Sequence, residues 1–163
     1  MKSQNLIAEL EHELVSTAKL LELVPADKLN WQPHPKAMTL GVLANHVAAI
    51  LGRYLTFADE GNTTIETLID HAVPKNKDEI LNNFKTNTAK AKELLNKSEA
   101  YWEGKSWNLT KNSSTVFTLP IEIFTRLLVF NHLFHHRGQL SVYLRLLDVP
   151  VPGMYGPSAD EKM

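Results

Sequence analysis

Three histidines within five residues give this sequence its clearest chemical potential. They lie in the stretch "NHLFHHRGQLSVYLR", residues 131–145, of a 163-residue chain that has only seven histidines. On an α-helix each residue advances by about 100°, so His132 and His136 project from nearly the same side, about one turn apart. This spacing lets one helix offer two imidazole nitrogens to a single metal ion. His135 points about 60° away from His132 and cannot easily share that ion with both.

A third histidine occupies a comparable position on another predicted helix, residues 39–59. His46 is flanked there by apolar residues on the face expected to meet the core, where Leu or Ile is usual. Inward imidazoles need hydrogen-bond partners or a shared cation, and no Asp or Glu lies on these two helix faces. The sequence therefore predicts a metal site of His46, His132 and His136. Three neutral ligands leave positions open for water or substrate, which is typical of catalytic sites.

Simpler interpretations stay open for the individual residues. A lone inward histidine is usually hydrogen-bonded to a carbonyl or a tyrosine. Gln139 and Tyr143 follow His136 on its side and either orient a ligand or a metal-bound water, or pack and support the ligands from behind. Arg53 either meets an anionic substrate or forms an ion pair. No catalytic residue is assigned.

Other residues are expected to take no part in the site. Arg137 points about 140° away from His132, which predicts an exposed or interface ion pair. Three more histidines lie on no such face and are expected to be solvated or loop residues: His12, His34 and His71.

Four segments with apolar residues at helical spacing must position these side chains. They cover residues 4–24, 39–59, 76–97 and 120–147, with Pro25 ending the first, Thr39 capping the second and Gly61 closing it. Their connections are longer than the roughly two to eight residues usual in bundles. We expect one all-α domain over residues 1–163, a four-helix bundle with long inter-helix connections. The connection at 99–118 holds either a short strand or an ordered cap.

The composition of the chain limits the kinds of molecule that it is expected to bind. The 17 Lys and Arg nearly balance the 18 Asp and Glu, which argues against nucleic-acid and anionic-membrane binding and favours a small-molecule substrate. The absence of cysteine excludes disulfides and a sulfur nucleophile from the chain itself. The N-terminus lacks the apolar core of a signal peptide, and no run of eighteen apolar residues occurs, so we expect a cytoplasmic protein without a membrane span.

An apolar stripe lies opposite His132 on the last predicted helix, where solvent is expected. Either a linker, such as residues 102–117, covers this stripe or it forms a homodimer interface, and we favour the homodimer. Its members are Ile123, Leu127, Phe130 and Phe134.

Four stretches together resemble the DinB-like family, also described as DinB/YfiT-like metalloenzymes. They are "WQPHPKAMTLG", "TLGVLANHVA", "NHLFHHRGQLSVYLRLL" and "VPVPGMYGPSADE", so the resemblance covers nearly the whole chain. It implies a four-helix bundle, often homodimeric, that holds a divalent metal. Nickel or zinc is expected first, then iron or manganese. The family's ligands, one histidine of the second helix and the HxxxH pair of the fourth, correspond to His46, His132 and His136.

Three functions follow as hypotheses. The favoured one is a thiol-dependent S-transferase acting on a small electrophile with a low-molecular-weight thiol, as the resemblance implies for some relatives. The second is a hydrolase that uses a metal-bound water, which would benefit from an inward carboxylate; only linker residues such as Glu60, Asp70 or Glu103 could supply one. The third is a stress-related metal- or ligand-binding protein without turnover.

Overall fold

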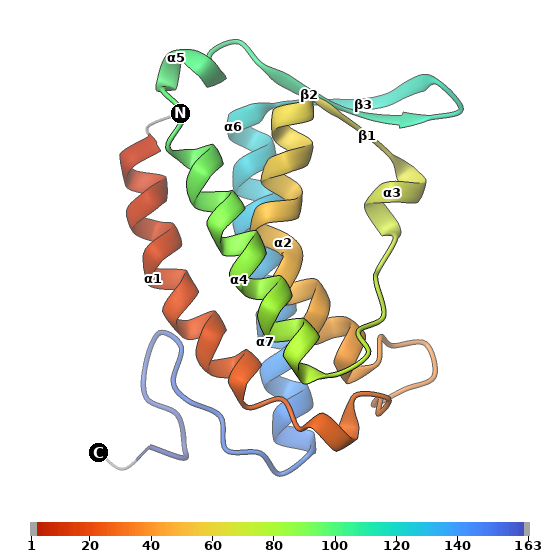
Figure 1. Cartoon of the computed structure of the whole chain (residues 1–163), viewed down its shortest axis with the longest axis vertical. Helices are drawn as coiled ribbons and strands as arrows, with labels where there is room; N and C mark the ends of the chain where they lie inside the picture. Colours follow the sequence, from red (N-terminus) through yellow and green to blue (C-terminus); the bar gives the residue numbers. More distant parts are fainter. Residues whose placement is uncertain (1–2, 162–163) are drawn as a thin grey trace.

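Four long helical segments lie side by side along the length of the molecule (Figure 1). This computed structural model describes residues 3–161. The predicted domain also includes residues 1–2 and 162–163, which lie outside the described residues. The segments are α1 (Ser3–Glu22), α2 (Leu40–Glu60), α4 (Lys77–Leu95) and a last run of α6 (Ile121–Phe124), η2 (Thr125–Asn131) and α7 (His132–Leu146). All four predicted helices are therefore present, with ends within a few residues of those expected.

Helix α2 is central, because it contacts α1, α4 and α7. It begins at Thr39, whose side chain accepts a hydrogen bond from Val42 N, and it ends at Gly61 in the left-handed conformation (φ 75°). Both ends agree with the sequence prediction. By length and composition α2 could cross a membrane, but 78% of its most apolar stretch is buried inside the fold, as in the core helix of a folded domain.

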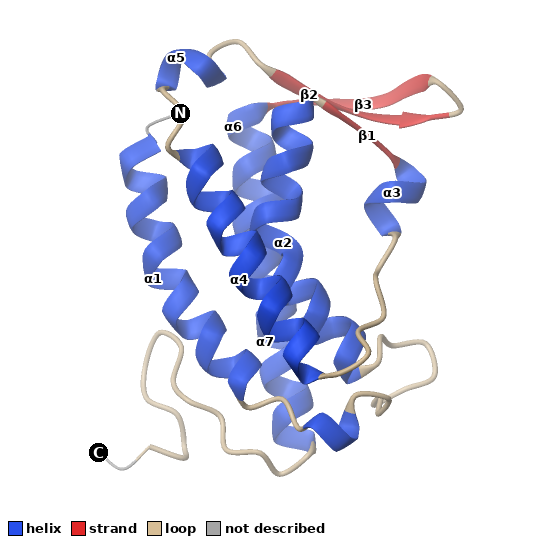
Figure 2. Ribbon diagram, viewed as in Figure 1, coloured by secondary structure: helices blue, strands red, loops and turns tan. Residues whose placement is uncertain are grey.

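A small sheet occupies the connections, so the all-α prediction is wrong there (Figure 2). Of the two alternatives left open for residues 99–118, strand structure is the one present. Strand β1 (Asn62–Thr64) pairs in parallel with β2 (Ser106–Lys111), which pairs antiparallel with β3 (Ser114–Pro120). The remaining connecting elements are short helices: η1 (Ala26–Lys28), α3 (Ile65–Ile69) and α5 (Glu99–Trp102).

Trp107 anchors this sheet to the helices. Its ring is 1% exposed and packs on Phe124 at 4.6 Å, while its Nε1 donates to Thr63 Oγ1 at 3.1 Å. The hairpin turns at Asn112 and Ser113, which both have positive φ, as hairpin turns of two residues require. Because β3 is exposed along nearly its whole length, it lacks the alternation that would have indicated a strand.

The last helical run is not one regular α-helix. Its η2 segment is π-helical, so each turn holds an additional residue and the 100° rule fails across it. Within α7 the buried side is about 100° from His132, not at the histidines as predicted. The buried residues that define it are Leu133, Arg137, Leu140 and Leu144. His132 and His136 therefore lie at the flank of the core.

Arg137 forms an ion pair, as predicted, but it is 2% exposed instead of lying at the surface. Its Nη2 pairs with Glu13 Oε2 at 2.5 Å, and its Nη1 donates to Thr17 Oγ1 at 3.2 Å. The Tyr155 hydroxyl accepts from Arg137 at 2.5 Å and donates to Glu13 Oε2 at 2.9 Å. This buried ion pair joins α7 to α1 and to the C-terminal segment.

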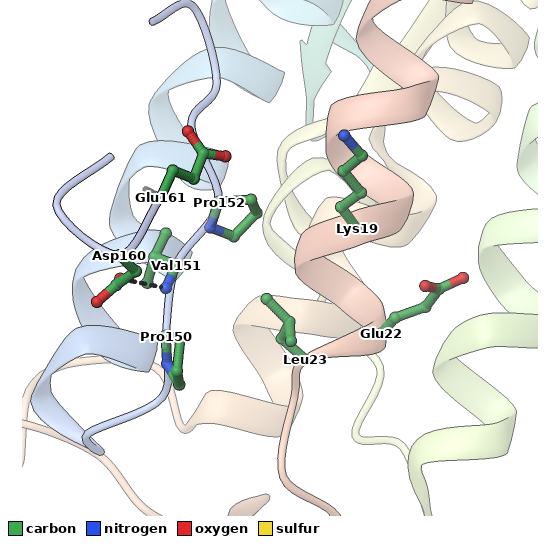
Figure 3. Close-up of a pocket in the computed structure, with 8 residues that line it drawn as sticks. All are labelled: Lys19, Glu22, Leu23, Pro150, Val151, Pro152, Asp160 and Glu161. Atoms are coloured by element: carbon green, nitrogen blue, oxygen red, sulfur yellow. Dashed lines mark hydrogen bonds between the residues drawn. The ribbon is translucent and has the colours of Figure 1, made fainter. Parts of the chain in front are cut away.

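The C-terminal segment folds back beside α1 and α7 (Figure 1). Asp160 accepts from Val151 N at 2.8 Å and pairs with Arg145 at 2.6 Å. Figure 3 shows the pocket of about 360 Å³ between this segment and the end of α1. It is lined by Lys19, Glu22, Leu23, Pro150, Val151, Pro152, Asp160 and Glu161.

The apolar stripe predicted for a homodimer is only partly at the surface. Phe130 is buried, and Phe134 packs partly against the core near the ring of Tyr155. Ile123 and Leu127 remain about half exposed, at 47% and 48%. Dimerisation through this helix stays a prediction that rests on these two residues, and a solution mass of twice 18.4 kDa is the expected result.

Substitution of Glu13 by Gln should destabilise the protein by about 3 kcal/mol, because it leaves the Arg137 charge buried without a counter-charge. The matched control is Glu9→Gln, which removes the exposed Glu9–Arg126 pair and should cost less than about 1 kcal/mol. Urea unfolding of the three proteins measures both losses. Equal losses would contradict a stabilising role for the buried charge pair.

Candidate metal centre

Helices α2 and α7 bring the three predicted histidines together. His46 comes from the middle of α2 and is 4% exposed, while His132 and His136 lie one turn apart at the start of α7 and are partly exposed. The ring centroids are separated by 4.9 Å for His46 and His132, and by 4.6 Å for each of the other two pairs. The HxxxH spacing therefore places both imidazoles beside His46, as the helical geometry predicts.

The distances between the imidazole nitrogens suit a bound metal ion. One nitrogen from each ring lies within 4.8 Å of the other two, and Nε2 of His46 is 3.2 Å from Nε2 of His132. Two nitrogens on a tetrahedral zinc ion at about 2.0–2.1 Å would be about 3.3 Å apart. No carboxylate of the described residues belongs to this group. The arrangement thus fits a divalent cation with three neutral ligands and room for others.

Burial keeps these imidazoles neutral. It lowers the pKa of His46 to about 2, with smaller effects from His136 and His132, and it lowers the pKa of His132 to about 4. The pKa of His136 is also lowered, chiefly by burial and against the hydrogen bond to Gln139. All three lone pairs are therefore free of protons at neutral pH, which is the form that binds a metal.

Gln139 orients one of the three rings. Its Oε1 lies 2.7 Å from Nδ1 of His136, and because an amide oxygen only accepts, this contact favours the tautomer with the proton on Nδ1 and Nε2 free. Of the roles left open for Gln139, this hydrogen bond supports that of a residue that holds His136 from behind. Tyr143 instead packs edge-on against Trp31 and donates to the Met38 carbonyl at 3.3 Å.

Two residues beside the group were not predicted. Tyr54 is buried with its ring 4.8 Å from that of His132. It follows His46 by eight residues on α2, about 80° around the helix, so helical periodicity alone does not indicate this contact. His71 is a loop residue, as expected, but its ring lies 4.4 Å from that of His46, which was not expected. Since His71 is in the irregular segment between α3 and α4, no periodic pattern could have indicated this contact.

The other predicted residues lie away from the nitrogens. Arg53 forms no ion pair with any residue that the structure describes: it donates to the backbone carbonyls of Asp70 and Thr67 and lies over the Phe57 ring. His135 is exposed with its ring 4.8 Å from His136, and His12 and His34 are exposed as expected.

A pocket of about 350 Å³ lies beside His46, between α2, α4 and the residues around His71. Its walls are mainly neutral polar groups and apolar side chains, with Arg53 as the charged member. The lining residues are Asn45, His46, Ala49, Arg53, Thr56, Phe57, His71, Ala72, Asn83 and Asn87. A small molecule in this pocket would have one of the three clustered histidines as part of its wall.

Comparison with known proteins gives a consistent result. A sequence model of the DinB family matches residues 1–162. The fold is similar to that of a DinB-like protein from Bacillus subtilis, with 20% sequence identity and a TM-score of 0.69 over 92% of this chain and 97% of the other. It is also similar to that of a DinB-like protein from Bacillus cereus, with 27% identity and a TM-score of 0.69 over 91% of this chain and 95% of the other. The structure of a putative member of the DinB family from Exiguobacterium sibiricum is similar too, with 20% identity and a TM-score of 0.67 over 97% of this chain and 95% of the other. No protein of curated function matches the chain significantly.

The metal-free protein should lose stability as the pH falls from about 6.5 toward 4. Unfolded histidines bind protons below a pKa of about 6.5, whereas folded His46 and His132 stay neutral, so protons favour the unfolded state. Each of the two should contribute about 1 kcal/mol per pH unit in this window. Urea unfolding in the presence of a chelator measures the slope.

Two variants provide the comparison for this slope. His46→Gln should show a shallower pH dependence than the wild type, whereas substitution of the exposed His34 by Gln should leave the slope unchanged. If wild type and His46→Gln have the same slope between pH 6.5 and 4, His46 is not held neutral by the fold.

Proposed function

Since the chain belongs to the DinB family, we propose that it is a divalent-metal-dependent enzyme whose ion is bound by His46, His132 and His136. The observation that carries the proposal is the approach of one nitrogen from each ring to within 4.8 Å of the others. Nickel or zinc is the proposed ion because imidazole nitrogens suit both metals. Membership of the family also leads us to propose a four-helix bundle as the fold class. The four long helical segments, which lie side by side, support this assignment.

The proposed reaction is transfer of the sulfur of a small thiol to an electrophile. A divalent ion, when bound, lowers the pKa of a coordinated thiol and so favours the thiolate. In the overall reaction a carbon–sulfur bond forms, the bond from that carbon to the leaving group breaks, and the thiol proton is released. The thiol must come from solution because the chain has no cysteine.

The protein's own residues would contribute orientation and a restricted environment. Gln139 fixes the tautomer of His136, and burial of His46 keeps water from one side of the group. The pocket of about 350 Å³ beside His46 is large enough for a small substrate.

Hydrolysis is less well supported than thiol transfer. A water nucleophile would benefit from a general base, and no Asp or Glu in the described part of the chain joins the three histidines. Of the linker carboxylates considered from the sequence, Glu103 lines a different pocket, together with Trp102 and Pro120.

Metal analysis of the purified protein tests the site. The wild type should bind close to one nickel or zinc ion per chain, and Ala substitution of any of the three histidines should weaken binding by more than about 100-fold, because even outer partners of a ligand contribute about 10- to 100-fold. His135→Ala is the matched control, since this exposed imidazole contacts His136 but is not in the group. A wild type that binds no divalent metal would sink the proposal.

The same metal-loaded preparations distinguish the reactions. With a panel of small thiols and monochlorobimane, the wild type should form the thioether faster than the His132→Ala protein does. Ester hydrolysis without thiol would instead identify the hydrolase. Metal binding with neither activity would favour a binding protein without turnover.

A further inference from the structure

The residues on either side of His71 are tied to α2, although they belong to an irregular segment. The Asp70 carbonyl accepts from Arg53 Nη1 at 2.6 Å, and the Ala72 carbonyl accepts from Asn45 Nδ2 at 3.1 Å. Asn45 is in turn held by Asn83 of α4, whose Nδ2 donates to Asn45 Oδ1 at 2.8 Å. His71 is therefore fixed from both sides.

This tether places an imidazole against the candidate metal centre. The His71 ring meets the His46 ring edge-on, with centroids 4.4 Å apart. Both residues line the pocket of about 350 Å³, so a small molecule in that pocket can contact both. His71 is not a member of the group of nitrogens within 4.8 Å of one another, which argues against a role as a fourth ligand.

One nitrogen of His71 lacks a partner. Its Nδ1 is shielded from solvent and makes no hydrogen bond to any described residue. Buried polar atoms of side chains that serve only to pack are usually paired, because an unpaired one costs free energy. Four other buried side-chain atoms of the described residues share this state, and among these atoms only Nδ1 of His71 and Nδ1 of His132 belong to histidines at the candidate metal centre.

We propose that His71 hydrogen-bonds through Nδ1 to the small molecule that binds at the open positions of the metal, and so contributes to thiol recognition. This inference rests on the proposed function. It identifies His71 as a binding residue, and Arg53 and Asn45 as residues that position it.

The test measures thiol binding to the cobalt(II)-loaded protein. Titration with 2-mercaptoethanol is followed by the thiolate-to-cobalt absorption band, and metal content is measured separately. His71→Leu should keep the cobalt but bind the thiol about tenfold more weakly, as expected for loss of one hydrogen bond to a charged group. His71→Asn retains a donor near the Nδ1 position and should recover most of the affinity. His135→Leu, which removes the exposed imidazole beside His136, should bind the thiol like the wild type.

Two results would overturn the inference. Loss of cobalt from the His71→Leu protein would indicate that His71 is a metal ligand. Equal thiol affinity of the His71→Leu protein and the wild type would show that His71 does not take part in thiol binding. If the wild type itself holds no cobalt, both the proposed function and the inference about His71 fail. The measured metal content distinguishes this result from the two results above. Arg53→Lys provides a second variant, because it retains His71 but cannot bridge the Asp70 and Thr67 carbonyls, and it should weaken thiol binding without loss of cobalt.

Discussion

The clustering of three neutral imidazoles in one place, with His46 buried, is the constraint on which the rest of the structure depends. Each ring brings nitrogens that must be paired, and among the described residues the centre offers few acceptors besides Gln139 and the other rings. Such an arrangement costs free energy unless something satisfies the nitrogens. A shared cation would do so for all three at once, which is why the cluster is better explained by function than by stability.

This constraint requires that α7 keep a fixed rotation relative to α2. On the buried side of α7, the Arg137 guanidinium joins Glu13 of α1 and the Tyr155 hydroxyl of the C-terminal segment. That charged contact has a directional geometry that packing of leucines alone would not impose. Near the start of the last helical run, Phe124 packs against Trp107 of the sheet. Contacts before His132 and directly after His136 thus hold the run that carries both histidines.

The sequence allowed the helices and the three clustered histidines to be predicted because both depend on local periodicity. Thr39 and Gly61 marked the ends of α2, and the HxxxH spacing placed two imidazoles on one side of α7. The pairing of the strands into a sheet, the burial of Arg137 and the contact of His71 with His46 could not be found in this way. Each depends on residues distant in sequence, such as Trp107 with Thr63 or Arg137 with Glu13, and a regular 100° step does not describe the π-helical segment.

The π-helical segment η2 also determines how the sequences of relatives should be compared with this one. Because it holds an additional residue per turn, α6 and α7 are two helices in different rotational phase joined without a break. A relative that lacks one residue between 125 and 131 would continue as an α-helix, and an ungapped alignment anchored on α6 would place its counterpart of His132 opposite Asn131. Correct alignment of His132 and His136 therefore requires that a gap be allowed inside an unbroken helix.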